Sequence, residues 1–120
     1  MSRIALLAAG LVATLALAAP IGATSSVTKL TGTVGPGFTI TLKKGTAKVK
    51  TLNAGTYKIT VNDKSNIHDF HLSGPGLNKV ITTTPFKGTK TVTVTFKKGK
   101  TYRYVCDPHA ATMKGSFKVT

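Results

Sequence analysis

An alternation of apolar and polar residues with a period of two constrains the fold of this chain more than any other feature. Residues 57–61 read YKITV, residues 38–42 read FTITL and residues 91–96 read TVTVTF. Successive side chains of a β-strand point to opposite faces, so this spacing collects apolar side chains on one face of each strand. An amphipathic helix needs apolar residues three and four positions apart, and no such stretch follows residue 23. The pattern predicts an all-β protein.

Glycine and proline punctuate these strands. Glycine permits the positive φ that tight turns need, while proline fixes φ and removes a backbone donor. Seven or eight short strands separated by such turns predict an antiparallel β-sandwich with its core between two sheets. The alternation places Phe38 on the core-facing side with Ile40 and Leu42. The turn signals lie at residues 35–37, 43–45, 53–55, 74–76 and 98–99.

The first 23 residues have the pattern of a secretory signal peptide. Arg3 gives the start a positive charge, and residues 4–19 form an apolar stretch without a charged residue. Small residues then occupy plausible cleavage positions before residue 24. A retained membrane anchor is the alternative, since a spanning helix needs about 20 apolar residues. We expect a signal peptide over residues 1–23, a secreted or periplasmic protein, and one domain over residues 24–120.

The residues with distinctive chemistry lie near the C-terminus. On a strand, Tyr102, Tyr104 and Cys106 share one face, so the single cysteine of the chain extends a core-facing aromatic row. Two residues separate Cys106 from His109, and three more separate His109 from Met113. One cysteine cannot form an intramolecular disulfide, which leaves packing or metal binding as its roles.

A second group of histidines lies upstream, where residues 66–72 read NIHDFHL. The alternation puts His68 on the core face and turns Asp69 and His71 toward solvent. An antiparallel sandwich would allow the segment with His68 and the segment with Cys106 to meet at one end of the molecule.

One thiolate, two imidazoles and one thioether form a soft donor set of sulfur and nitrogen. Calcium and magnesium prefer oxygen ligands, whereas this set suits copper. Two histidines and one cysteine in a trigonal arrangement, with a long weak bond to methionine, define the blue-copper electron-transfer site. Four side-chain ligands leave no open position for a substrate, which argues against an enzyme.

Over residues 34–120 the sequence resembles the cupredoxins, in particular the plastocyanin, pseudoazurin and amicyanin group. The resemblance is carried by Cys106-Asp107-Pro108-His109, by Met113 with a glycine two residues later, and by Ile67-His68-Asp69-Phe70. It implies a Greek-key sandwich that holds one mononuclear type 1 copper ion. His68, Cys106 and His109 would be the equatorial ligands, with both imidazoles bound through Nδ1, and Met113 the axial ligand.

The resemblance also implies an apolar patch around His109, whose ring edge would pass the electrons. Pro108, Ala110 and Pro75 would contribute to this patch. One departure concerns Asp69, because family members commonly carry asparagine there, and its side chain helps tie the two ligand loops together. An ionised carboxylate accepts hydrogen bonds but cannot donate them.

The net charge of the chain is +14, from 17 Lys or Arg against 3 Asp or Glu. Such a charge serves solubility, or steers the protein toward an acidic redox partner or an anionic envelope. Nucleic acid is not expected as a partner, because the chain has an export signal and no recognition motif.

These observations predict a monomeric type 1 copper protein that carries single electrons and does not span a membrane after signal cleavage. A copper storage or delivery module and a metal-free adhesive β-sandwich are the alternatives.

Overall fold

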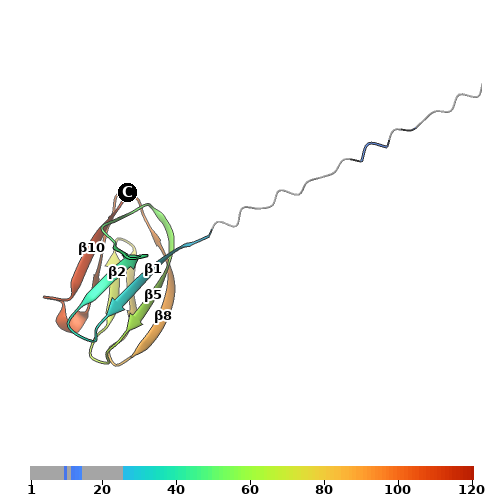
Figure 1. The fold of residues 1–120 in the computed structure, drawn as a ribbon. Coiled ribbons are helices and arrows are strands. Elements are labelled where there is room, and N and C mark those ends of the chain that lie inside the picture. Colours follow the sequence, from blue (N-terminus) through green and yellow to red (C-terminus); the bar gives the residue numbers. More distant parts are fainter. Residues whose placement is uncertain (1–9, 11, 15–25) are drawn as a thin grey trace, which may run out of the picture.

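The computed structural model describes residues 10, 12–14 and 26–120 (Figure 1). The predicted signal peptide, residues 1–23, lies almost wholly outside these residues and stays a prediction. Within the described residues, no helix has the length and hydropathy needed to cross a bilayer.

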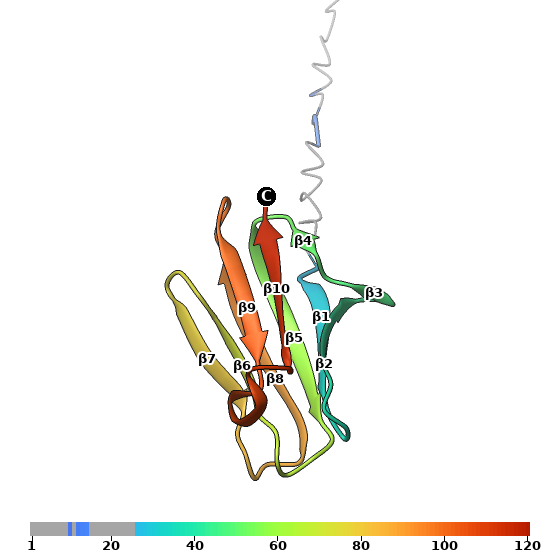
Figure 2. The same ribbon diagram turned by 90° about the vertical axis from the view of Figure 1, so that its left-hand side faces the viewer.

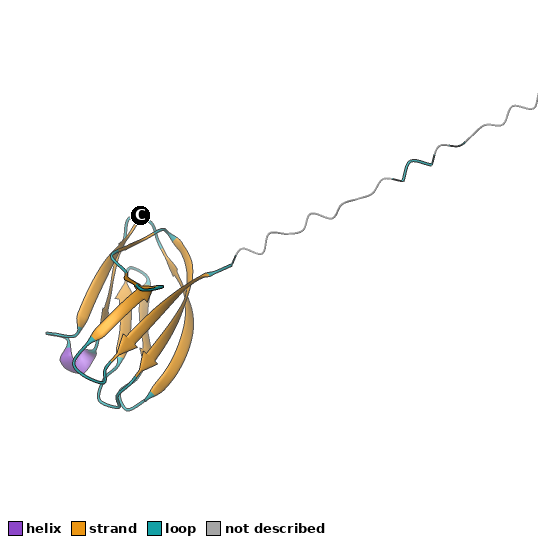
Figure 3. Cartoon of the chain, viewed as in Figure 1, coloured by secondary structure: helices purple, strands orange, loops and turns teal. Residues whose placement is uncertain are grey.

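Strands make up nearly all of the described regular structure, and the one helix is a single 3₁₀ turn, η1 (Asp107–His109), drawn in purple in Figure 3. Eight strands have five or more residues, which agrees with the seven or eight that the turn signals predict. Two further strands have two residues each. The strands are β1 (Thr28–Val34), β2 (Ile40–Lys44), β3 (Ala47–Lys48), β4 (Thr51–Leu52), β5 (Gly55–Asp63), β6 (Phe70–Gly74), β7 (Leu77–Thr82), β8 (Gly88–Phe96), β9 (Thr101–Val105) and β10 (Lys114–Val119).

The strands form two five-stranded sheets that face each other (Figure 2). The first has the order β3-β2-β1-β5-β8 and the second the order β4-β10-β9-β6-β7. The predicted sandwich is confirmed, but its sheets are mixed. Strand β1 runs parallel to β5, and β4 runs parallel to β10. Period-two alternation reports which face a side chain occupies and carries no information about strand direction, so parallel pairs were not visible in the sequence.

The core lies between the sheets and is built from the apolar members of the alternating strands. In β5 the side chains of Tyr57, Ile59 and Val61 are buried, as the pattern predicts. The prediction for Phe38 is wrong, because its side chain is 63% exposed. Strand β2 begins only at Ile40, so Phe38 belongs to the preceding loop and strand parity does not apply to it.

Strand register divides the loops between two ends of the sandwich. Val34, Asp63 and Gly88 are aligned across the first sheet, so the loops β1–β2, β5–β6 and β7–β8 share one end. In the second sheet Val105 pairs with His71, which places the β9–β10 loop at that end too. We call it the ligand end. The β8–β9 and β6–β7 turns and the C-terminus lie at the opposite end, as does the start of β1 (Figures 1 and 2).

Candidate metal centre

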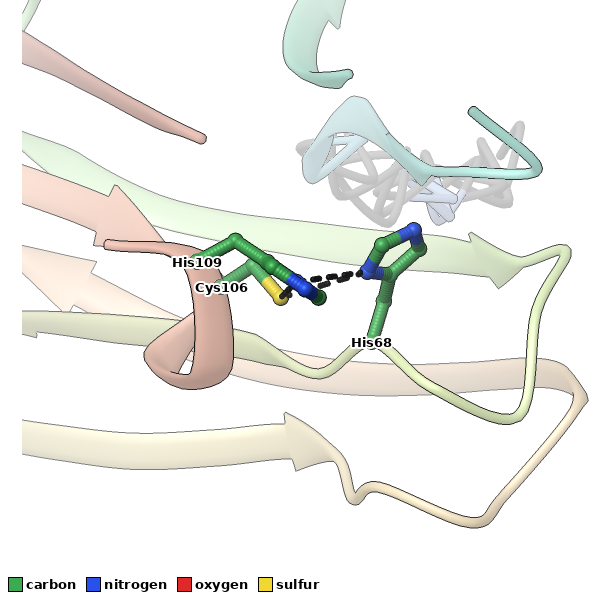
Figure 4. A group of neighbouring side chains, drawn as sticks. All are labelled: His68, Cys106 and His109. Atoms are coloured by element: carbon green, nitrogen blue, oxygen red, sulfur yellow. Dashed lines mark hydrogen bonds between the residues drawn. The ribbon is translucent and has the colours of Figure 1, made fainter. Parts of the chain in front are cut away.

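Two loops of the ligand end supply three side chains with metal-binding chemistry. His68 lies in the β5–β6 loop and is fully buried, as is Cys106, which directly follows β9. The chain then turns through η1, with a proline in its first turn, and ends this helix at the half-buried His109. Figure 4 shows the three side chains converging from these two segments.

The potential ligand atoms of these residues lie within 4.8 Å of one another. The Cys106 Sγ atom is 3.6 Å from Nδ1 of His68 and 3.6 Å from Nδ1 of His109. The two Nδ1 atoms are 3.1 Å apart. A transition-metal ion at about 2.0–2.3 Å from three such atoms, at trigonal angles, separates them by roughly 3.5–3.7 Å. The sulfur–nitrogen distances match, and a small rotation of either ring would bring the nitrogen–nitrogen distance into the same range.

Backbone hydrogen bonds fold the β9–β10 loop around this centre. The Cys106 N–H donates to the Met113 carbonyl at 3.0 Å, and the Met113 N–H donates to the His109 carbonyl at 2.8 Å. The His109 N–H donates to the Cys106 carbonyl at 3.0 Å. Met113 is buried beneath the loop with only 1% of its surface exposed. The loop therefore has a fixed shape that depends on backbone atoms of the candidate ligands themselves.

A glycine beyond the loop is required by close packing. Gly115 pairs with Tyr104 across β10 and β9, and a Cβ atom at this glycine would overlap the Tyr104 ring. Gly115, two residues after Met113, therefore makes room for the ring of Tyr104, which lies two residues before Cys106.

Asp69 does not point to solvent as strand parity predicts. It is buried, because β6 begins only at Phe70 and the chain bends before it. The Asp107 N–H donates to Asp69 Oδ1 at 2.6 Å, which joins the His68 segment to the Cys106 segment. Asp69 therefore makes the tie between the ligand loops by accepting a hydrogen bond. Burial, followed by the side-chain hydrogen bond with Asp107, raises the pKa of Asp69 to about 6.

The thiol of Cys106 lies in an environment that favours its protonated form. Burial raises the pKa of Cys106, and the nearby carboxylate of Asp69 adds to this effect. A bound metal cation has the opposite effect, because its positive charge stabilises the thiolate. The Cys106 sulfur is therefore protected as a thiol and becomes a strong ligand when a cation binds.

His71 faces outward, as predicted, and forms a polar cluster on the surface of the second sheet. Its Nδ1 lies 2.9 Å from Asp107 Oδ2, and its Nε2 contacts Asn78 Oδ1. Burial acts to lower the pKa of His71, but the hydrogen bonds to Asn78 and Asp107 outweigh it and raise this pKa. His71 thus holds Asp107 in place from outside and is not part of the candidate metal centre.

The sequence pattern missed Phe38, whose ring lies against both candidate ligand imidazoles. The ring centroids are 4.9 Å apart for Phe38 and His109 and 5.6 Å apart for Phe38 and His68, with edge-to-face geometry in both cases. The Gly-Pro-Gly sequence just before Phe38 was the available signal, since it extends the loop as far as Thr39.

Phe38 and Ile67 are the exposed large apolar side chains in the loops of the ligand end. The exposed residues Pro108 and Ala110 flank His109, as predicted. Pro75 is not part of this surface. It lies in the β6–β7 turn beyond Gly74, at the opposite end of the sandwich, because β6 runs away from the ligand end.

The model of the plastocyanin/azurin family of copper-binding proteins matches residues 33–120. The chain belongs to this family. No match was found among proteins with curated functions. Among solved structures, a rusticyanin variant has 22% sequence identity and a TM-score of 0.50, with 77% of this chain and 76% of that chain covered. A rusticyanin from Thiobacillus ferrooxidans has 25% identity and a TM-score of 0.47, with the same coverage. An oxidised amicyanin variant has 20% identity and a TM-score of 0.41, with 59% and 68% covered.

The family and the donor set agree on the cofactor. Two imidazole nitrogens and a thiolate sulfur within 4.8 Å of one another are the equatorial donors of a type 1 site. The centre formed by His68, Cys106 and His109 fits one type 1 copper ion.

Proposed function

We propose that the protein is an exported carrier of single electrons, with His68, Cys106 and His109 as equatorial copper ligands and Met113 as the axial ligand. The observation that carries the proposal is the convergence of two Nδ1 atoms and the Cys106 sulfur on one point. The chemistry that copper supplies when bound is the exchange of one electron between Cu(II) and Cu(I).

The surroundings of the ligands favour a site that changes little between the two oxidation states. His68 is held among buried residues, and the loop from Cys106 to Met113 is closed by backbone hydrogen bonds. The Asp69 carboxylate ties these two segments together. Ligands held in this way need little rearrangement when the charge of the site changes, which lowers the barrier to electron transfer.

Electrons would enter and leave through His109. It is the one member of the three-residue centre that is not fully buried, and exposed apolar residues surround it. A redox partner that packs on Phe38 and Pro108 would approach the His109 ring without water between them. The net charge of +13 on residues 24–120, after removal of Arg3 from the +14 of the whole chain, favours an acidic partner.

Copper reconstitution tests this function. We expect the protein loaded with Cu(II) to show an intense blue thiolate-to-copper charge-transfer band and a reversible one-electron wave in voltammetry. Cys106→Ser should lose the band, whereas Ser116→Ala, an exposed change on neighbouring β10, should keep it. A colourless copper complex would contradict electron transfer and favour copper storage or delivery, and absence of copper binding would leave a metal-free sandwich.

A further inference from the structure

The end of the sandwich opposite the ligand end carries a cluster of lysines, which we call the basic end. Lys97, Lys98 and Lys100 occupy the β8–β9 turn. The Val119 N–H donates to the Lys100 carbonyl at 2.9 Å, and the Lys118 N–H donates to the Lys50 carbonyl at 3.1 Å. These bonds bring Lys50 and Lys118 beside the turn, and all five lysines are exposed.

No acidic side chain balances this charge. The chain has three acidic residues, Asp63, Asp69 and Asp107, and all of them lie at the ligand end. The ion pair found in the described residues joins His71 to Asp107, so no described lysine is paired with an acid. The molecule is therefore electrically polarised along its strands.

Some of the lysines lie directly opposite one another on paired strands. Lys43 of β2 faces Lys48 of β3, and Lys29 of β1 aligns with Lys58 of β5. Like charges directly opposite one another destabilise a sheet. These four lysines lie outside the basic end itself, and they show that positive charge is also crowded on the strands of the first sheet.

The basic end lacks the anchors of a specific protein interface. Stable protein–protein contacts depend on buried aromatic and apolar anchor residues at their centre. Within residues 26–120 the exposed aromatic anchor, Phe38, lies at the ligand end, and Val27 is the one large exposed apolar side chain beside the basic end. Clustered lysines without anchors suit a surface of dense and mobile negative charge, such as the headgroups of anionic lipids.

We propose that the basic end docks on an anionic lipid bilayer. Clusters of four to eight basic residues bind such bilayers through the negative surface potential, in a manner that salt weakens. Strands run from one end of the sandwich to the other, so docking through the basic end turns the ligand end away from the bilayer. The start of β1 also lies at the basic end and would face the membrane. This inference does not depend on the copper function.

Vesicle sedimentation tests the proposal on the full chain. The probe is phosphatidylcholine vesicles with about 30% phosphatidylglycerol, at about 0.1 M salt. We expect the wild-type chain to sediment with these vesicles, and the double variant Lys97→Glu, Lys98→Glu to bind at least roughly 25-fold more weakly, since each basic residue contributes about fivefold. Binding should also weaken as salt rises.

The matched control is Lys64→Glu, Lys87→Glu, which makes the same change in net charge with exposed residues of the ligand end. It should lose several-fold less binding than the other variant. Any contribution of the N-terminal segment is common to all variants and cancels. Equal weakening of both variants would overturn the proposal and assign binding to net charge alone. A wild-type chain that stays in the supernatant would also overturn it and would favour an acidic protein as the partner of the basic end.

Discussion

The two ends of the sandwich are built in different ways. At the ligand end, side chains from segments 38 residues apart are buried against each other, and all three carboxylates lie near them. At the basic end, short turns present exposed lysines that contact no acid. The strands between the ends keep them apart, since the five residues of β9 alone span roughly 17 Å. A β-sandwich of this kind can keep a metal centre at one end apart from a charged binding surface at the other. The strands hold the loops of the two ends too far apart for their side chains to touch.

The largest expected difference between the ends is in how copper stabilises the fold. Copper at 100 times its dissociation constant should stabilise the native state by about 2.7 kcal/mol. For a domain of this size such a change raises the melting temperature by roughly 10 °C or more. His68→Ala should lose this gain and Lys98→Ala should keep it. Thermal unfolding with and without copper checks the prediction, and an equal gain in both variants would contradict it.

Close packing near the ligand end should contribute to the stability of the fold, although much of this end consists of loops. Gly115→Ala places a methyl group inside the Tyr104 ring, and we expect a loss of about 1–3 kcal/mol in the free energy of unfolding. Gly37→Ala is the matched control, because a Cβ atom there meets no neighbour within 4 Å. Urea unfolding of both variants measures the difference. Similar losses in the two variants would show that the close approach of Gly115 to Tyr104 is unimportant.

The ligand end should also respond to pH. The pKa of Asp69 rises from 3.8 to about 6 on folding, so the folded copper-free protein binds a proton more tightly than the unfolded chain does. The contribution of Asp69 to the stability of the folded state is therefore largest below about pH 4, and it declines as pH rises toward 6. Melting temperatures of copper-free Asp69→Asn should depend less on pH in this window. The raised pKa of Asp69 would be contradicted if the melting temperature of the wild type, relative to that of Asp69→Asn, rose between pH 4 and 6.

The charge of the molecule should make electron transfer depend on ionic strength in two opposite ways. Electron exchange between two copies of this strongly positive protein should become faster as the salt concentration rises, because salt screens their repulsion. Exchange with an acidic partner should become slower, because salt screens the attraction. Stopped-flow or NMR rates at several salt concentrations check both trends. A salt-independent rate with an acidic partner would remove steering as a role for the lysines.

The smallest expected effect is that of the basic end on the copper site. The double variant Lys97→Glu, Lys98→Glu should leave the visible spectrum of the copper-loaded protein unchanged. Its reduction potential should be almost unchanged. The strand length between these lysines and Cys106 exceeds the Debye length of about 8–10 Å at physiological salt. A large shift in potential would show that the two ends are electrostatically coupled.

The sequence predicted the sandwich and the closeness of Cys106 to His109 where the relevant signal is local, while the ligand roles stay a prediction. Cys106, His109 and Met113 lie within one short loop, so their spacing already limits how far apart they can be. Within strands, the period of two also predicted the buried row of Tyr102 and Tyr104. The same rule failed for Phe38 and Asp69, because both lie just before a strand begins, where the backbone bends and parity no longer holds.

The sequence by itself determined the all-β class, the soft donor set and the excess of positive charge, because these follow from residue types and short-range spacing. Only the tertiary structure decided that two strand pairs are parallel, that Pro75 lies far from the centre, and that Asp69 ties the ligand loops. It also decided that five lysines from three separate segments meet at the end opposite Cys106. Each of these depends on contacts between segments distant in the chain, and their geometry is set by sheet register and packing, which no local pattern encodes.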